Sequence, residues 1–211
     1  MKVARVTQQD ALPKRRSREA TEVRRARILE AAIGLLGERG YYGFTIQELG
    51  KRCGLSNPGL LHYFPSKLDV LLQVLTELEA RETEFMEPLF QQAIQEAGSR
   101  GAVLTILRAM GMRAAAHPGY LRVLVELQAE SLSPEHPAHE WWLRRDAITR
   151  QFIADILRPH VPRPDAVARQ VLALMDGFCT QWLRDPSPAD IAGEWDDAIA
   201  RLLPELSDDH A

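Results

Sequence analysis

Residues 44–67 read FTIQELGKRCGLSNPGLLHYFPSK, and this stretch predicts two short helices joined by a tight turn. Thr45 and Glu48 have the spacing of a capping box, in which the Thr hydroxyl accepts from the Glu amide and the Glu carboxylate returns to the Thr amide. The first helix should therefore begin at Ile46. Gly54 should end it, since glycine adopts the left-handed conformation at a helix C-terminus without steric cost.

A second helix should begin directly after that turn. Ser56 is a good N-cap, and Pro58 falls in the first turn, where its missing N–H would be unpaired in any case. Leu60 and Phe64 are four residues apart and give this helix one buried face. Two such helices form a helix-turn-helix, in which the N-terminal end of the second helix enters the major groove of DNA.

The outward-facing residues of this second helix are candidates for reading base edges, because Asn can pair with adenine, His can donate to a base and Leu can contact a thymine methyl. Lys67 follows Ser66, a further predicted N-cap, so its ammonium and the free amides of that helix start are candidates for binding a phosphate. Helix pairs with a glycine turn also occur in all-α domains that bind no DNA, and His62 alone fits a capped surface histidine equally well. The outward-facing residues are Asn57, Gly59, Leu61, His62 and Tyr63.

Composition and charge place this motif in its context. The chain has 211 residues, 45% of them apolar and 26% charged, which favours one compact unit, or one plus a small module, and excludes wholesale disorder. Residues 1–70 hold 13 Lys and Arg against 7 Asp and Glu, whereas residues 71–211 hold 13 against 22. A net charge of +6 followed by one of −9 indicates that the first third meets a polyanion, although chance clustering on solvated faces is the alternative.

The compartment is predicted from what the sequence lacks. No run approaches the roughly 20 apolar residues of a membrane helix, and the N-terminus has no signal-peptide core. Cys53 and Cys179 match no zinc or C-x-x-C spacing and suit a reducing cytosol. We therefore expect a cytoplasmic protein with no membrane partner.

Helical periodicity dominates the chain, and strand signals are nearly absent. Ile28, Ala32, Leu35 and Leu36 form one apolar stripe, and Gly40 stands where that helix should stop. A similar stripe follows at Leu68, Leu71, Leu72 and Leu75. The predicted class is all-α, with about nine or ten helices. The residues that should divide the remainder into helices are Pro88, Gly101, Pro118, Pro134, Pro162, Pro164, Pro186 and Pro188.

The N-terminal region resembles the DNA-binding domain of the tetracycline-repressor (TetR) family over residues 28–71, ILEAAIGLLGERGYYGFTIQELGKRCGLSNPGLLHYFPSKLDVL. The run HYFPSK after a Thr-capped helix is the most specific part of the match. The resemblance implies a three-helix DNA-binding domain followed by a helical domain for ligand binding and dimerisation. The DNA contacts that it implies come from Thr45, Ser56, Asn57, Gly59, His62, Tyr63 and Lys67.

On this basis the chain divides into four parts. Residues 1–19 contain little to bury and a crowd of basic residues, so we expect a flexible basic arm there. The helix-turn-helix domain should cover residues 20–66, the effector-binding and dimerisation domain residues 67–205, and a short tail residues 206–211.

The segment from Asp165 to Leu183 has apolar residues on two faces, and a helix of this kind must bury both. One face belongs in the core of its own subunit, and the other fits against a second subunit. The segment from Glu140 to Leu157 is the candidate partner helix, so that two chains would form a symmetric four-helix bundle. A central helix in a monomer is the alternative.

Candidate residues for an effector cavity are Met and aromatic side chains, which make adaptable walls, although such residues more often belong to the core. Asp176 stands among apolar neighbours, where an unpaired carboxylate is costly to bury. It should either pair with an Arg of an adjoining helix or meet a cationic effector. The candidate residues are Met110, His117, Tyr120, Phe152, Met175, Asp176 and Phe178.

Motifs for other chemistry are weak. His136, His139 and Glu140 have metal-like spacing, but Pro137 breaks any helix that would align them, so we expect an exposed loop and no metal site. No nucleophile elbow, P-loop or dinucleotide fingerprint is present, and we expect neither an enzyme nor a cofactor.

The sequence favours a homodimeric, one-component transcriptional regulator, most simply a repressor that leaves a palindromic operator when a small molecule binds. The alternatives are a DNA-binding protein without an effector, constitutive or architectural, and a small-molecule carrier or enzyme.

Overall fold

The computed structural model describes residues 12–96, 99–185 and 191–207, and within these ranges the chain is all-α, as predicted. In the described part of the chain, no helix is both long enough and apolar enough to cross a membrane. The helices of these ranges are α1 (Leu12–Gly43), α2 (Ile46–Cys53), α3 (Asn57–Leu61), α4 (Lys67–Gln95), α5 (Arg100–Ala116), α6 (Pro118–Glu130), α7 (His139–Leu157), α8 (Pro164–Arg184), α9 (Ile191–Leu202) and α10 (Pro204–Ser207).

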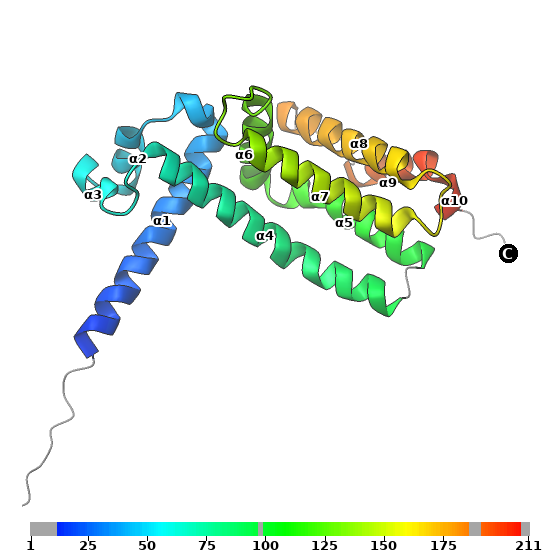
Figure 1. Ribbon diagram of the computed structural model, residues 1–211, viewed down its shortest axis with the longest axis horizontal. Helices are drawn as coiled ribbons and strands as arrows, with labels where there is room; N and C mark the ends of the chain where they lie inside the picture. The colour runs from blue at the N-terminus through cyan, green and yellow to red at the C-terminus, as the bar shows by residue number, and fades with distance from the viewer. Residues whose placement is uncertain (1–11, 97–98, 186–190, 208–211) are drawn as a thin grey trace, which may run out of the picture.

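The helices are arranged in two groups that share α4 (Figure 1). Helices α1, α2 and α3 lie at one end, and α4 runs from them along the second group. Helices α7 and α8 lie side by side, and α9 packs on α5 and α8. The most extensive contact between two helices of the described chain joins α1 to α6. The DNA-binding end predicted from the sequence is therefore packed directly on a helix of the larger domain.

The hydrophobic core of the first group continues into the second. Leu35, Leu36, Phe44, Leu49 and Leu60 are fully buried, as the apolar stripe and the short helices predict. The same buried cluster includes Leu127 of α6 and the two tryptophans at the start of α7, Trp141 and Trp142. A second buried cluster fills the space between α5, α7, α8 and α9.

Gly40 breaks the regular course of α1 where the sequence predicts a stop. Its φ of 66° and ψ of −179° lie outside the helical region, and helical turns continue beyond it to Gly43. A side chain is strained in this conformation, so glycine is the residue that permits the kink.

Two expectations about helix boundaries and one about burial are corrected. Residues 12–19, expected to belong to a flexible arm, are part of α1, while residues 1–11 lie outside the described residues. Pro88 lies within α4 rather than between two helices. Leu68 and Leu72 are about half exposed, so only Leu71 and Leu75 of that stripe are buried. Pro186 and Pro188 fall outside the described residues.

The segment between α6 and α7 also differs from the expectation of an exposed loop. The side chain of His136 is buried, with 2% of the residue exposed, and His139 and Glu140 form the first turn of α7. His139 Nδ1 lies 2.7 Å from the carbonyl oxygen of Ser131. Within the described residues, no group of three or more His, Cys, Asp and Glu is placed to hold a metal ion.

Helix α8 has the bounds that the sequence predicts to within one residue, and α7 packs along it as expected. Its N-terminal half is buried in this chain through Ala168, Val171 and Leu172. Farther along, Trp182 and Leu183 are only half-buried. On α7, Leu143 and Ile148 remain largely exposed.

Candidate nucleic-acid interface and interior cavity

Helix α2 is fixed at both ends by the residues that the sequence predicts. The Thr45 hydroxyl accepts a 3.1 Å hydrogen bond from the amide of Glu48, and Gly54 ends the helix in the left-handed conformation with φ 67° and ψ 31°. The Glu48 carboxylate lies 3.9 Å from Arg39 Nε, whereas a capping box would return it to the Thr45 amide. The bond from the Glu48 amide to the Thr45 hydroxyl is therefore confirmed. The Glu48 carboxylate faces Arg39 instead of the Thr45 amide.

Helix α3 presents one face to the core and one to solvent. The Ser56 hydroxyl accepts from the amide of Gly59 at 3.2 Å, and Pro58 lies in the first turn. Leu60 and Phe64 are buried, with at most 1% of each residue exposed. The helix is therefore held from one side only, with its N-terminal end free to contact a ligand.

The predicted DNA-contacting residues fall into two groups. Thr45, Ser56, Asn57, Leu61 and His62 are exposed, and Leu61 is 41% exposed despite its apolar side chain. The remaining three, Gly59, Tyr63 and Lys67, are partly buried. Asn57 and Leu61 of α3 and its C-cap His62 are therefore accessible to a ligand, and Tyr63 is accessible in part.

Arg25 holds this helix pair against α4, a role that the sequence pattern did not reveal. Its guanidinium donates 2.9 Å hydrogen bonds to the carbonyl oxygen of Tyr63 and to Gln73 Oε1. Its Cζ also lies 4.6 Å from the centre of the Phe64 ring. Arg25 thus connects α1 to α4 and to the residues that follow α3.

Lys67 is half-buried, and its side chain folds back onto the end of α1. Its Nζ donates to the carbonyl oxygen of Tyr42 at 3.3 Å and lies 4.8 Å from the ring centres of Tyr41 and Phe44. Burial lowers the pKa of Lys67, and Glu130 partly opposes this effect. The Lys67 side chain therefore ties the first residue of α4 to the end of α1.

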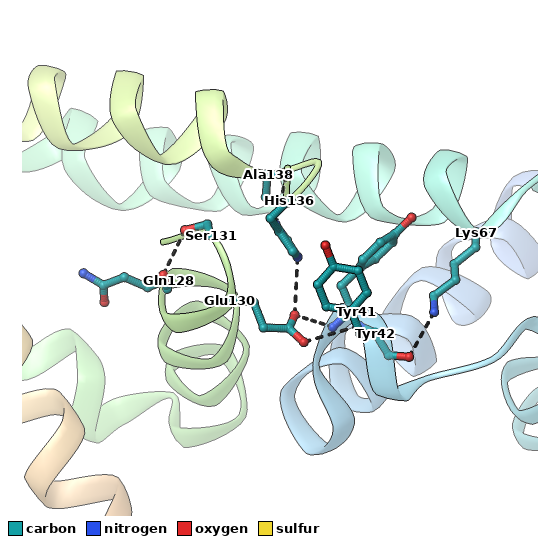
Figure 2. A network of polar contacts seen from close by, with 8 residues as sticks. All are labelled: Tyr41, Tyr42, Lys67, Gln128, Glu130, Ser131, His136 and Ala138. Atoms are coloured by element: carbon teal, nitrogen blue, oxygen red, sulfur yellow. Dashed lines mark hydrogen bonds and ion pairs between the residues drawn. The ribbon is translucent and has the colours of Figure 1, made fainter. Parts of the chain in front are cut away.

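A network of polar contacts connects α6 to the same region (Figure 2). The Glu130 carboxylate accepts from the backbone amides of Tyr41 at 2.6 Å and Tyr42 at 3.3 Å. His136 Nε2 lies 3.4 Å from Glu130 Oε2, and His136 Nδ1 accepts from the amide of Ala138 at 3.1 Å. Burial lowers the pKa of His136, partly opposed by Glu130. One carboxylate thus joins α6, α1 and the loop before α7.

An interior cavity of about 70 Å³ lies among α4, α5, α6, α7 and α8. Four of the predicted effector-contacting residues line it: Met110, Tyr120, Met175 and Asp176. The others that line it are Glu82, Phe85, Arg113, Leu121, Leu124, Val125, Gln128, Trp142, Arg145, Thr149 and Cys179. The polar members of this set are spread over five helices, so sequence spacing could not bring them together.

Three predicted residues lie elsewhere. His117 is exposed and borders a surface depression that Tyr120 shares. Phe152 packs on Phe90, with ring centres 4.4 Å apart, in the groove between α4 and α7. Phe178 packs edge-on against Trp195, with ring centres 5.7 Å apart.

Glu82 is the electrostatic centre of the cavity. Its Oε2 pairs with Arg113, accepts from the Tyr120 hydroxyl at 3.1 Å, and lies 3.6 Å from Arg145. Burial and the neighbouring Glu82 raise the pKa of Tyr120 to about 12. Because the Tyr120 hydroxyl stays protonated, it remains a donor to Glu82.

Asp176 has a different partner from the one expected. The sequence predicts either an ion pair with an arginine or contact with a cationic effector. In the structure, Gln128 Nε2 donates to Asp176 Oδ2 at 3.0 Å. Burial raises the pKa of Asp176; the Gln128 hydrogen bond opposes this effect, while the nearby Asp146 adds to it. Gln128 lies two residues before Glu130, so α6 contacts the cavity and the end of α1 within its last turn.

The sequence of the helix-turn-helix region is similar to that of known bacterial regulators. Residues 28–74 match the sequence profile of the family described as bacterial regulatory proteins, tetR family. The HTH-type transcriptional regulator CymR of Pseudomonas putida is 37% identical over 73 residues, which is 34% of this chain and 36% of CymR. The chain thus matches about a third of the length of that relative.

Solved structures resemble the fold over most of the chain. The structure of AibR with isovaleryl coenzyme A and operator DNA has a TM-score of 0.67 at 17% identity, covering 86% of this chain and 98% of that one. The structure of FadR from Bacillus subtilis with stearoyl-CoA has a TM-score of 0.64 at 15% identity, covering 84% and 97%. At these identities the likeness concerns the fold alone.

Proposed function

We propose that the chain, which matches the TetR family of bacterial regulatory proteins through residues 28–74, is a one-component transcriptional regulator that binds operator DNA as a homodimer. The observation that carries this proposal is the geometry of α3. Its buried face is fixed by Leu60 and Phe64, and its opposite face presents Asn57, Leu61 and His62 to solvent. This is the arrangement in which a recognition helix enters the major groove.

The outward residues of α3 supply the chemistry of base recognition. Asn57 is an amide able to pair with adenine in bidentate fashion, His62 is a donor to a base or phosphate, and Leu61 is an apolar group for a thymine methyl. The Thr45-capped start of α2 and the Ser66-capped start of α4 offer free backbone amides to phosphates. Lys67 contributes by fixing the second of these helix starts, through its bond to Tyr42.

Dimerisation is proposed through α7 and α8, which pack along one another in the larger domain. The exposed Leu143 and Ile148 of α7 and the half-buried Trp182 and Leu183 of α8 leave apolar surface for a second copy. A two-fold dimer presents two recognition helices about one turn of DNA apart and therefore reads a palindrome.

Regulation is proposed to pass through α6. A small molecule in the cavity contacts α6 between Tyr120 and Gln128, and the Glu130 carboxylate at the end of the same helix holds the amides of Tyr41 and Tyr42. An effector that favours another position of α6 would move α1 and α4 and change the spacing of the two α3 helices. A coupling of about 2–4 kcal/mol would release the operator by factors of roughly 30 to 1,000. This role as a repressor requires no catalysis and suits a cytoplasmic protein.

Footprinting on the DNA that flanks the gene of this protein tests the proposal. We expect protection of two half-sites one turn apart, with an affinity that falls as salt rises. If each dimer neutralises six to eight phosphates, the slope of log affinity against log salt should be about −5 to −7. Absence of protection at every salt concentration would contradict the proposed function.

A further inference from the structure

Within the described ranges, Trp142 Nε1 and Arg113 Nη1 are buried donors of the cavity lining without a hydrogen-bond partner, and Arg145 is held only by a longer ion pair. Arg145 has a side chain that is only 21% exposed, forms no hydrogen bond within the described ranges, and has its closest carboxylate oxygen, that of Glu82, 3.6 Å away. Trp142 is 5% exposed, and its indole Nε1 lacks a hydrogen-bond partner among the described residues. Because buried donors are nearly always paired in folded proteins, the Trp142 indole N–H calls for an acceptor from outside the chain, and the half-buried Arg145 guanidinium has N–H groups to spare for the same acceptor.

Arg145 and Trp142 lie next to each other at the cavity. Arg145 and Trp142 are three residues apart on α7, the Arg145 Cζ lies 5.1 Å from the centre of a Trp142 ring, and both side chains line the cavity. An arginine side chain offers five N–H donors in a planar fork and no acceptor. That fork matches the two oxygens of a carboxylate.

The charges around the cavity favour an anion over a cation. Arg113 and Arg145 bring two positive charges, and both are directed to the single carboxylate of Glu82, which also accepts from Tyr120. Asp176, the second carboxylate of the lining, accepts from Gln128, and burial raises its pKa. The aromatic faces that would attract a cationic ligand are already covered by arginines, with Arg113 over Phe85 and Tyr120.

The volume of the cavity limits the size of the ligand. About 70 Å³ is roughly half of the ~150 Å³ cavity that takes a benzene molecule. Without movement of the surrounding helices, the cavity therefore suits an acid of a few carbon atoms.

We propose that the cavity binds a small organic acid, whose carboxylate pairs with the Arg145 guanidinium and accepts the indole N–H of Trp142. The acyl chain lies on the apolar side of the cavity, against Met110, Leu124 and Met175. That this acid is the effector rests on the proposed function, whereas its binding does not.

Thermal unfolding of the full chain with matched probes tests the proposal. Butyrate is compared with butyramide and butylamine at constant ionic strength, because the three differ in the charge of the head group and little in size. At a hundred times its Kd, butyrate should raise the Tm by about 5 to 10 °C. Butyramide and butylamine should leave the Tm unchanged. A larger shift with the amine, or no shift with butyrate, would overturn the proposal.

Variants of α7 locate the binding group. Arg145→Gln should abolish the butyrate shift, while Arg144→Gln, which changes the exposed neighbour on the same helix, should retain it. Trp142→Phe keeps an aromatic ring and removes the N–H, so it should weaken butyrate binding about tenfold or more. An equal butyrate shift in the wild type and Arg145→Gln would show that the acid binds elsewhere, and this would refute the assignment.

A second measurement on the wild type guards against variants that fail to fold. The indole N–H resonance of Trp142, assigned by its loss in Trp142→Phe or by conventional methods, should move downfield as butyrate is added. A resonance that stays in place while butyrate stabilises the protein would contradict the proposed contact. These measurements use no DNA, so failure of the proposed function, seen as absence of DNA binding, is distinguishable from failure of acid binding.

Discussion

The carboxylate of Glu130, at the end of α6, accepts a 2.6 Å hydrogen bond from the backbone amide of Tyr41, 89 residues earlier in the chain. Tyr41 follows the kink at Gly40, so the bond satisfies an amide where the regular helix is interrupted. The Glu130 carboxylate also accepts from the amide of Tyr42, and the carbonyl oxygen of Tyr42 accepts from Lys67, the first residue of α4 (Figure 2). Tyr42 therefore links Glu130 to the start of α4. The end of α6 therefore sets the position of both helices that support the helix-turn-helix.

Replacement of Glu130 should weaken this connection. Glu130→Ala leaves the amides of Tyr41 and Tyr42 without their charged acceptor, and we expect a loss of about 2 kcal/mol in the free energy of unfolding. Urea denaturation measures it. Glu126→Ala, which changes an exposed residue one turn earlier on α6, is the control and should stay within about 0.5 kcal/mol of the wild type. Equal losses in both variants would show that the Glu130 bonds add nothing.

Gly40 should not tolerate a side chain. Its φ of 66° is unfavourable for other residues, and a Cβ added there would clash with the Glu130 carboxylate. Gly40→Ala should therefore cost about 2 to 3 kcal/mol of unfolding free energy, measured by urea denaturation. Gly119→Ala is the matched change, because a Cβ at Gly119 meets no atom within 4 Å, and it should be neutral or slightly stabilising. A neutral Gly40→Ala would mean that the kink is not required.

Base recognition by α3 predicts an effect confined to particular positions of the DNA. Asn57→Ala should cost about 1–3 kcal/mol of binding free energy at one or two base pairs and leave affinity for unrelated duplexes nearly unchanged. Lys67→Ala should weaken binding to all sequences alike. It should also lower the Tm, because Lys67 binds Tyr42 within the protein. Competition binding with single-base-pair variants of the operator measures both effects. Uniform weakening by Asn57→Ala would remove Asn57 from base readout.

The buried His136 predicts a loss of stability in mild acid. Its pKa is lowered in the folded protein, so below the ordinary value of about 6.5 the unfolded chain takes up a proton that the folded chain does not. The free energy of unfolding should therefore fall as the pH drops through 6.5. His136→Asn, whose side-chain oxygen can still accept from the Ala138 amide, should remove this part of the pH dependence. Thermal unfolding between pH 7.5 and 5.5 tests this, with the exposed His62→Asn as control. An unchanged pH profile in His136→Asn would contradict it.

Local signals predicted the helix-turn-helix, because its decisive contacts are short in sequence. Thr45 caps the start of α2, Gly54 ends α2 in a conformation that favours glycine, and Ser56 caps the start of α3. These three residues lie within twelve positions of one another, so their roles can be read from a single short segment. The role of Lys67 was harder to foresee. Its ammonium is predicted to bind phosphate, and the structure adds contacts with the Tyr42 carbonyl and the rings of Tyr41 and Phe44, which folding brings close.

The larger domain was less predictable because its contacts join distant segments. Pro88 was expected to end a helix, yet α4 continues through it. His136 was expected in an exposed loop, because the residues around it gave no sign that its side chain is buried beside the Glu130 carboxylate. The cavity shows the same limit: Met and aromatic residues were foreseen as lining, but Arg145 was not, because a surface-facing arginine and a cavity-facing one look alike in a sequence.

Selection of bound duplexes from a random DNA pool by the purified chain tests the central claim most directly. We expect enrichment of one palindromic sequence, with half-sites one helical turn apart, and a relaxed preference at one or two base pairs of each half-site when Asn57→Ala replaces the wild type. Enrichment of no sequence, or of a single half-site bound by one copy of the chain, would contradict it.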